Sequence, residues 1–245
     1  MFPLEKLRVG HLPLPQRVVL SLTLIVLGIG YAIAMVNLYL TYNLTDGQPG
    51  MTPEDMRRAF YGQRENTKLA SKINGGSMAQ FLPKPGDKEK ILSWIQDGAE
   101  RDGFEVVVKP IVDQNCVRCH NPNGLQRFAP LTSYEQVMTV TQIDRGEPVS
   151  LWTRVAHTHI QSIGLIFLVL GGAFSFTSLS TRVKVLILVL PFAALLLDFG
   201  ARLMAKLVPA AVYVMMAAGG LMGTMFGVMI LVPLYEMWVK REKVY

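Results

Sequence analysis

The sequence contains only two cysteines, Cys116 and Cys119, among its 245 residues. Two cysteines cannot form the disulfide framework of a small secreted domain. Charged residues are also scarce at 17%, and the chain has no run of five or six like charges and no internal repeat. Because a basic stripe with interleaved aromatics is also missing, we do not expect nucleic acid as a partner.

Apolar residues are abundant, at 51% of the chain, which is high for a soluble protein of this length. Four stretches, 18–40, 160–179, 185–205 and 208–234, approach or exceed the roughly 20 helical residues that cross a membrane. The first continues past Ala34, which is long for a signal peptide, so we expect an uncleaved anchor. The predicted fold is all-α, with four transmembrane helices in contact with membrane lipid.

The positions of Lys and Arg predict the orientation, because positive residues beside spans stay in the cytoplasm. One side would carry Lys6, Arg8, Arg17, Arg182, Lys184, Lys240, Arg241 and Lys243. The other side would carry only Arg154, Arg202 and Lys206. We therefore expect a multi-pass protein of the bacterial cytoplasmic (inner) membrane with both termini in the cytoplasm.

This orientation predicts three parts of the chain. Residues 1–41 hold the N-terminus and first span, residues 42–152 form a periplasmic domain, and residues 153–245 hold the other spans. The middle part has 13 basic and 14 acidic residues, so it is nearly neutral. The positive net charge of +6 therefore belongs to the membrane parts.

The middle part contains the motif Cys116-Val117-Arg118-Cys119-His120. Two thiols at this spacing can form thioethers with the two vinyl groups of one haem, and the adjacent imidazole can bind its iron. A zinc site would need further Cys or His ligands, and 42–152 has no other histidine. A redox C-x-x-C pair would not require His120. The motif predicts one covalent haem c.

The sequence around the motif resembles the small bacterial c-type cytochromes. Residues 104–112 resemble the first helix of such a module, and 130–137 resemble the helix after the haem loop, with Thr132 or Ser133 as its N-cap. The resemblance implies a mainly helical haem module inserted between the first two spans.

The final part of such a module lies upstream here. Met78 is followed by the proline-containing stretch 81–85 and by Trp94-Ile95-Gln96-Asp97-Gly98-Ala99, which resembles the usual last helix. The module therefore resembles a circular permutant, with its last and first helices joined through 100–103. In this arrangement Trp94 and Phe104 should pack where the two helices cross, and Met78 should be the sixth iron ligand.

Other residues could supply that ligand. Met138 follows His120 closely in sequence but also fits a packing role, and His157 or His159 could reach the iron from the start of the second span. An open, five-coordinate iron is a further alternative.

The third span contains an ionisable pair, Asp198 and Arg202, at the i, i+4 spacing of one helix face. With His157 or His159 this pair could form a site where quinol releases protons, or it could simply neutralise itself. Since the two histidines diverge by about 200 degrees on a helix, only one of them should join such a site.

The fourth span has Gly219, Gly223 and Gly227 at every fourth position. Small residues at this spacing permit close helix packing, within the chain or against another subunit. Gly171 and Gly172 of the second span could provide the facing surface.

These features predict electron transport by a membrane-bound c-type cytochrome subunit. It would pass single electrons between quinol or a membrane redox partner and a periplasmic redox centre, within a respiratory or photosynthetic multi-subunit complex. One variant makes it part of a quinol-oxidising oxidoreductase. The alternative of another class is a haem-based redox or gas sensor, or an assembly subunit, acting through a partner protein.

Overall fold

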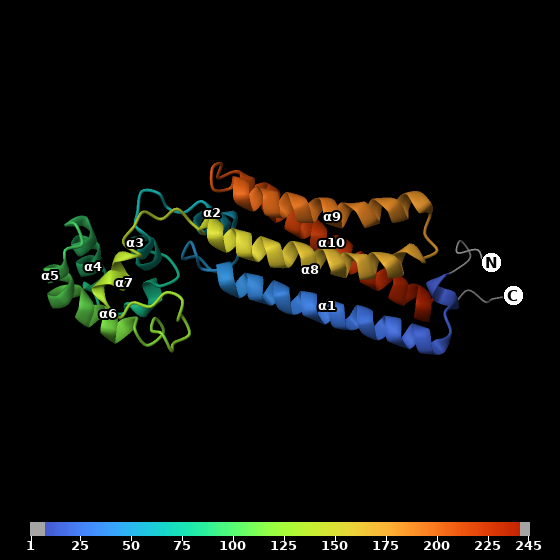
Figure 1. Cartoon of the computed structure of the whole chain (residues 1–245), viewed down its shortest axis with the longest axis horizontal. Helices are drawn as coiled ribbons and strands as arrows, with labels where there is room; N and C mark the ends of the chain where they lie inside the picture. The colour runs from blue at the N-terminus through green and yellow to red at the C-terminus, as the bar shows by residue number, and fades with distance from the viewer. Residues whose placement is uncertain (1–7, 241–245) are drawn as a thin grey trace. The chain divides into compact units, whose positions relative to one another are not determined.

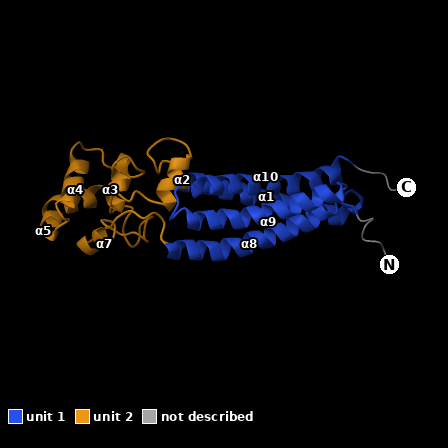
Figure 2. Cartoon of the chain, turned by 90° about the horizontal axis from the view of Figure 1, so that it is seen from above, with its two compact units in different colours: residues 1–41, 149–245 blue, residues 42–148 orange. Residues whose placement is uncertain are grey.

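The computed structural model describes residues 8–240, which form two units (Figure 2). Unit 1 contains the described residues up to Thr41 and from Val149 onward, and unit 2 contains Tyr42–Pro148. Within the described residues the regular elements are helices, and β-type pairing is limited to one bridge between Thr67 and Ile143. Three residues of the charge pattern, Lys6, Arg241 and Lys243, lie outside the described residues.

Unit 1 consists mainly of four long helices that run alongside one another (Figure 1). They are α1 (Leu14–Tyr42), α8 (Val149–Ser175), α9 (Thr181–Met204) and α10 (Ala211–Trp238). Each is long and apolar enough to cross a membrane. The all-α fold class and the four spans are therefore confirmed, and the chain is a multi-pass membrane protein.

The ends of α8 differ from the predicted span 160–179. The helix begins at Val149, because the polar residues before Ile160 continue its backbone hydrogen bonding although hydropathy alone does not include them. It ends at Ser175, because the chain then turns: Thr177 N donates to Phe174 O at 3.0 Å, and the amide of Ser178 bonds to Glu236 rather than to the helix.

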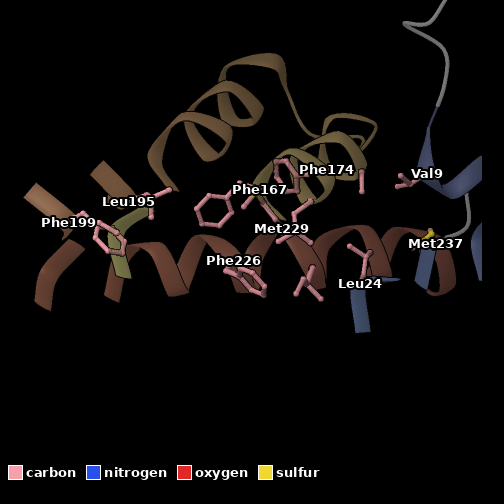
Figure 3. Packing of buried hydrophobic residues seen from close by; sticks show 13 residues of the cluster. Val9, Leu24, Phe167, Phe174, Leu195, Phe199, Phe226, Met229 and Met237 are labelled. Atoms are coloured by element: carbon pink, nitrogen blue, oxygen red, sulfur yellow. The ribbon is translucent and has the colours of Figure 1, made fainter. Parts of the chain in front are cut away.

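The core of unit 1 is built from aromatic and long aliphatic side chains of all four helices (Figure 3). Phe167 and Phe174 of α8, Phe226 and Met229 of α10, and Leu24 of α1 are almost completely buried. Figure 3 shows Phe167 among residues of α9 and α10, so α8 is held by contacts on both neighbours.

Glycines permit two of the close helix contacts in unit 1. A Cβ on Gly223 would lie 2.3 Å from the Tyr31 hydroxyl, so any other residue there would require the Tyr31 ring, which stacks on Phe226 at 4.4 Å, to shift. The prediction that Gly171 faces α10 is wrong. Its Cβ position is 2.9 Å from Leu188 of α9, because α8 turns that side towards α9, and Gly172 contacts nothing comparable.

The end of unit 1 that holds the α8–α9 connection is fixed by polar contacts to backbone atoms. The Glu236 carboxylate of α10 accepts from the Ser178 amide at 2.8 Å and from its hydroxyl at 2.5 Å. Arg8 donates to Thr177 O at 2.6 Å, and Arg17 donates to Met237 O at 3.1 Å. These bonds satisfy the buried carboxylate and pin the loop to α10.

Unit 2 is a set of short helices joined by loops. These are α2 (Pro53–Phe60), α3 (Lys68–Ile73), η3 (Ala79–Phe81), α4 (Asp87–Gln96), α5 (Arg101–Gly103), the π-helical η4 (Phe104–Val108), α6 (Lys109–Asn115) and α7 (Tyr134–Met138). Thr52 caps α2 through a reciprocal pair of bonds with Asp55, and Ser133 caps α7, so Ser133 is the N-cap of the two predicted alternatives.

The two ends of unit 2 are tied together by backbone hydrogen bonds. Lys68 N donates to Gln142 O at 3.0 Å, Leu69 N donates to Val140 O at 2.8 Å, and Glu147 N donates to Ala59 O at 2.8 Å. Residues 42–69 and 139–148 thus form a common base for the segment between them. This closure lets a compact unit be inserted between two membrane helices.

The core of unit 2 centres on the contact between α4 and the helical stretch 101–115. The rings of Trp94 and Phe104 are 5.8 Å apart, and Tyr134 meets the edge of Phe104 at 5.5 Å. The Trp94 indole also donates to Glu100 O at 2.8 Å. The predicted packing of Trp94 against Phe104 is confirmed, and it fixes the helix that leads into the C-x-x-C-H motif.

Candidate functional site

The C-x-x-C-H motif begins where α6 ends. Phe104 O accepts from Lys109 N across the wider π turn, and Pro110, which has no N–H, follows directly. Cys116 N and Val117 N then both donate to Val112 O, at 2.8 and 3.0 Å, which closes the helix. The end of this helix therefore determines where the first cysteine lies.

The motif itself forms one tight turn. Cys119 N and His120 N both donate to Cys116 O, at 3.1 and 2.9 Å. The two thiols are half-buried and are not joined in a disulfide. Burial raises the pKa of the Cys116 thiol to about 11, and the neighbouring Cys119 is the second cause. The Cys116 sulfur is thus protonated near neutral pH in the folded chain.

The His120 ring is held in a defined orientation. Its Nδ1 lies 2.8 Å from Ala129 O, and the His120 carbonyl accepts from Leu131 N at 2.9 Å. Because a carbonyl can only accept, Nδ1 carries a proton in this bond, and in the neutral ring Nε2 is then the nitrogen with the lone pair. The segment before Pro130 thereby fixes which nitrogen can bind a metal.

The loop that follows His120 folds back onto the motif. Gln126 N donates to Cys119 O at 2.9 Å, and the Asn121 side-chain amide donates to Val117 O at 2.7 Å. A Cβ at Gly124 would lie 2.3 Å from Cys119 O, so glycine is required at this approach. The loop 121–129 is consequently a fixed part of the site.

Two methionines pack against the same cluster as Cys116. Met78 and Met138 are both half-buried neighbours of the unit 2 core. The Thr141 hydroxyl donates to Met138 O at 2.9 Å and lies 3.5 Å from the Met138 sulfur, and Met78 N donates to Lys72 O at 3.0 Å. These contacts do not distinguish the two sulfurs as possible ligands.

A second polar group lies in unit 1. Arg202 Nε donates to Asp198 Oδ2 at 3.1 Å, and Asp198 is only 3% exposed. Trp152 of α8 donates to Phe199 O at 3.2 Å, which ties α8 to this part of α9. The other Asp198 oxygen points towards Gly219, whose Cβ position is 3.9 Å away. The predicted ion pair is confirmed and is packed among three helices.

Of the two histidines of α8, His159 is the one that joins this group. Its ring centroid is 6.3 Å from that of Phe199, and the Arg202 guanidinium lies 5.0 Å from the centre of the same ring. His159 Nδ1 also bonds to Val155 O at 3.0 Å, which leaves Nε2 directed away from its own helix. Both histidines are exposed, and His157, two positions away, lies on a different side of α8.

Within residues 8–240, no three His, Cys, Asp or Glu side chains converge so that they alone could hold a metal ion. The Cys116, Cys119 and His120 side chains thus do not form a small-ion cage with one another or with a nearby carboxylate. Such a cage is what a zinc site in this part of the chain would need.

Sequence reasoning missed three features of these sites. Trp152 and Glu236 were not singled out, although an aromatic beside a span and a carboxylate near a span end are both signals of polar contacts. The third is the Ala129 carbonyl, which no side-chain pattern can reveal.

Comparison with known proteins concerns mainly unit 1. Residues 146–244 match the model of a protein family described as a transmembrane helical domain. The match covers α8, α9 and α10, so it supports the assignment of these helices as membrane spans. No curated protein and no solved structure matches the chain.

Proposed function

We propose that the protein is a membrane-anchored c-type cytochrome that carries single electrons through one haem c held by unit 2. The observation that carries the proposal is the geometry of the C-x-x-C-H turn. Its two thiols lie on one turn of chain, and the bond from His120 Nδ1 to Ala129 O leaves Nε2 free for iron.

The residues of the turn fit this group. Thioether attachment needs two separate thiols at a fixed short spacing, and Cys116 and Cys119 are not joined to each other. A histidine that binds a metal almost always donates its other ring N–H to a backbone carbonyl, a carboxylate or water, which fixes the ring and makes it a better ligand. Ala129 provides that carbonyl. When bound, the haem supplies a one-electron iron couple.

Met78 is the residue of this chain that we propose would provide the second ligand to the iron. Its side chain packs against the same cluster as Cys116, and it has the position that the resemblance to a cytochrome module gives to the methionine ligand. A thioether ligand favours reduced iron and so raises the reduction potential. The resulting carrier would accept electrons readily from a membrane donor.

The proposed location of unit 2 is the periplasm, with the protein in the bacterial inner membrane. Support comes from the placement of Lys and Arg beside the spans, among them Arg8, Arg17 and Lys184 at one end of unit 1. We further propose that the membrane helices associate with other subunits of an electron-transfer complex.

A second proposal makes unit 1 a quinol-oxidising site. The observation that favours it is the grouping of Asp198, Arg202 and His159 around Phe199. Asp198 can accept a proton there, and Arg202 offsets its charge until it does. His159 Nε2 is a second acceptor, and the Phe199 ring provides an apolar face for a flat headgroup.

Optical spectra of the purified full chain in detergent test the first proposal. The oxidised protein should show the weak far-red charge-transfer band of sulfur bound to haem iron, and this band should disappear in Met78→Ala but persist in the matched control Met138→Ala. Carbon monoxide should bind the reduced Met78→Ala protein and not the parent. Carbon monoxide binding to the parent would contradict Met78 ligation and favour a haem-based sensor.

A further inference from the structure

We propose that the haem-loop surface of unit 2, made of Leu125, Phe128, Lys84, Arg118 and Arg127, docks an acidic electron-carrier protein. The inference rests on the proposed function, since it places a partner beside the attachment turn. It goes beyond that function by naming the docking residues and the charge of the partner.

Two large apolar side chains on this surface are almost fully uncovered. Leu125 is 90% exposed and Phe128 is 89% exposed, more than any membrane-facing residue of comparable size in unit 1. Burying a large apolar side chain stabilises a folded protein, so leaving both in water forgoes that stabilisation. Paired exposure of this kind marks an interaction surface.

The exposure does not come from a loosely held loop. Ala129 N donates to Gln126 O at 2.9 Å, Gly124 N donates to Asn121 O at 3.0 Å, and Gln126 N bonds to the motif itself at Cys119 O. These bonds fix the backbone of the turn that carries Leu125 and Phe128. A preformed surface loses little conformational entropy when a partner binds.

The charges on this surface are of one sign. From Gln114 to Tyr134 the chain has no Asp or Glu, while Arg118 and Arg127 are both exposed. Lys84 Nζ bonds to Gln114 Oε1 at 2.9 Å, which adds a third positive charge beside the motif. The nearest acid before this stretch, Asp113, is paired with Lys109 at 2.7 Å.

The combination favours a protein with an acidic patch as the occupant. Positive charges around an apolar centre steer a negatively charged partner and speed its association. Arg127 lies 4.9 Å from the centre of the Phe128 ring, so a partner would contact the positive charge and the apolar ring at the same place. An anionic lipid surface would also attract these charges, but it would cover the turn that has to exchange electrons with a partner.

Binding and electron transfer to two probe proteins test the proposal. The probes are an acidic and a basic cupredoxin, offered to the haem-loaded full chain in phosphatidylcholine nanodiscs. Binding is measured by biolayer interferometry and haem reoxidation by stopped flow. The acidic probe should bind more tightly and react at least about 10-fold faster at low ionic strength, and the difference should shrink as salt is added.

Substitutions separate the parts of the surface. Arg118→Glu and Arg127→Glu should each weaken binding of the acidic probe about 5-fold or more, whereas the equal charge change Lys90→Glu on α4 should have a much smaller effect. Phe128→Ser should weaken binding without altering its salt dependence. Equal binding of both probes, or equal effects of the three charge reversals, would overturn the proposal.

Two further results distinguish the docking proposal from the proposed function and from binding of the same surface to membrane lipid. A chain without covalent haem that still prefers the acidic probe would leave the docking surface intact while refuting the proposed function. Nanodiscs containing phosphatidylglycerol provide the test for lipid. If anionic lipid abolishes the preference for the acidic probe through Arg118 and Arg127, the surface binds membrane and the docking proposal is wrong.

Discussion

Replacing Phe104 by alanine should destabilise unit 2 more than any other single change on the helical stretch 101–115. Phe104 is 1% exposed and its ring touches both Trp94 and Tyr134. Removing a buried Phe side chain costs about 3–5 kcal/mol, because apolar contact is lost and a cavity remains. Since domains have about 5–15 kcal/mol of stability, a third or more of it would be lost.

A double-mutant cycle should show that Phe104 and Trp94 are coupled. Phe104→Leu and Trp94→Leu keep the core apolar while removing one ring each. A ring pair 5.8 Å apart at 45° lies in the favourable range, so we expect a coupling free energy of about 0.5–1.5 kcal/mol. Trp94→Leu should cost about 1 kcal/mol more through the lost bond to Glu100 O.

Pulse proteolysis of the full chain in detergent over a urea series measures these free energies through cleavage of unit 2. Val106→Ala is the matched control on the same helix, because Val106 is 77% exposed and its loss should change stability by less than about 0.5 kcal/mol. A Phe104→Ala effect as small as that of Val106→Ala, or a coupling of zero, would refute the packing of α4 on this helix.

Three further predictions concern other parts of the chain. If Asp198 is the proton acceptor of a quinol site, Asp198→Asn should slow quinol-driven haem reduction by roughly 10²-fold with normal assembly; if it only balances Arg202, yield and thermal stability should fall while kinetics stay normal. In the haem-free chain with the second cysteine of the motif changed to serine, alkylation of Cys116 should keep accelerating well above pH 9, because burial is the main cause of its raised thiol pKa, and levelling near pH 9 would contradict that burial. With both motif cysteines replaced, Lys90→Cys should react with an impermeant maleimide on intact spheroplasts and Lys240→Cys should not; the reverse labelling would contradict the proposed orientation.

The spans could be predicted from sequence because hydrophobic length alone determines them. Their ends could not be placed as well, since α8 continues through the polar residues before Ile160 and stops where Glu236 holds Ser178. Both effects depend on hydrogen bonds rather than on hydropathy. The contact of Gly171 with Leu188 likewise depends on how α8 is rotated about its own axis, which the amino-acid composition does not specify.

In unit 2 a helix cap could be predicted from neighbouring residues, whereas contacts between residues far apart in the chain could not be predicted from residue types alone. Ser133 caps a helix as one of the two predicted alternatives, because capping involves only neighbouring residues. The contact of Trp94 with Phe104 was predicted through the resemblance to a cytochrome module. The bond from His120 to Ala129 joins a side chain to a distant backbone atom, so no pattern of residue types could reveal it.

The mass of the peptide that contains Cys116 and Cys119 tests the central proposal most directly. The full chain should be expressed in a bacterium that has cytochrome c maturation machinery, purified and digested for mass spectrometry. The proposal predicts that this peptide carries the added mass of one haem, that either single Cys→Ser variant carries at most one thioether, and that the double variant carries none. An unmodified peptide from a chain that is folded and correctly inserted would contradict the assignment of unit 2 as a haem c carrier.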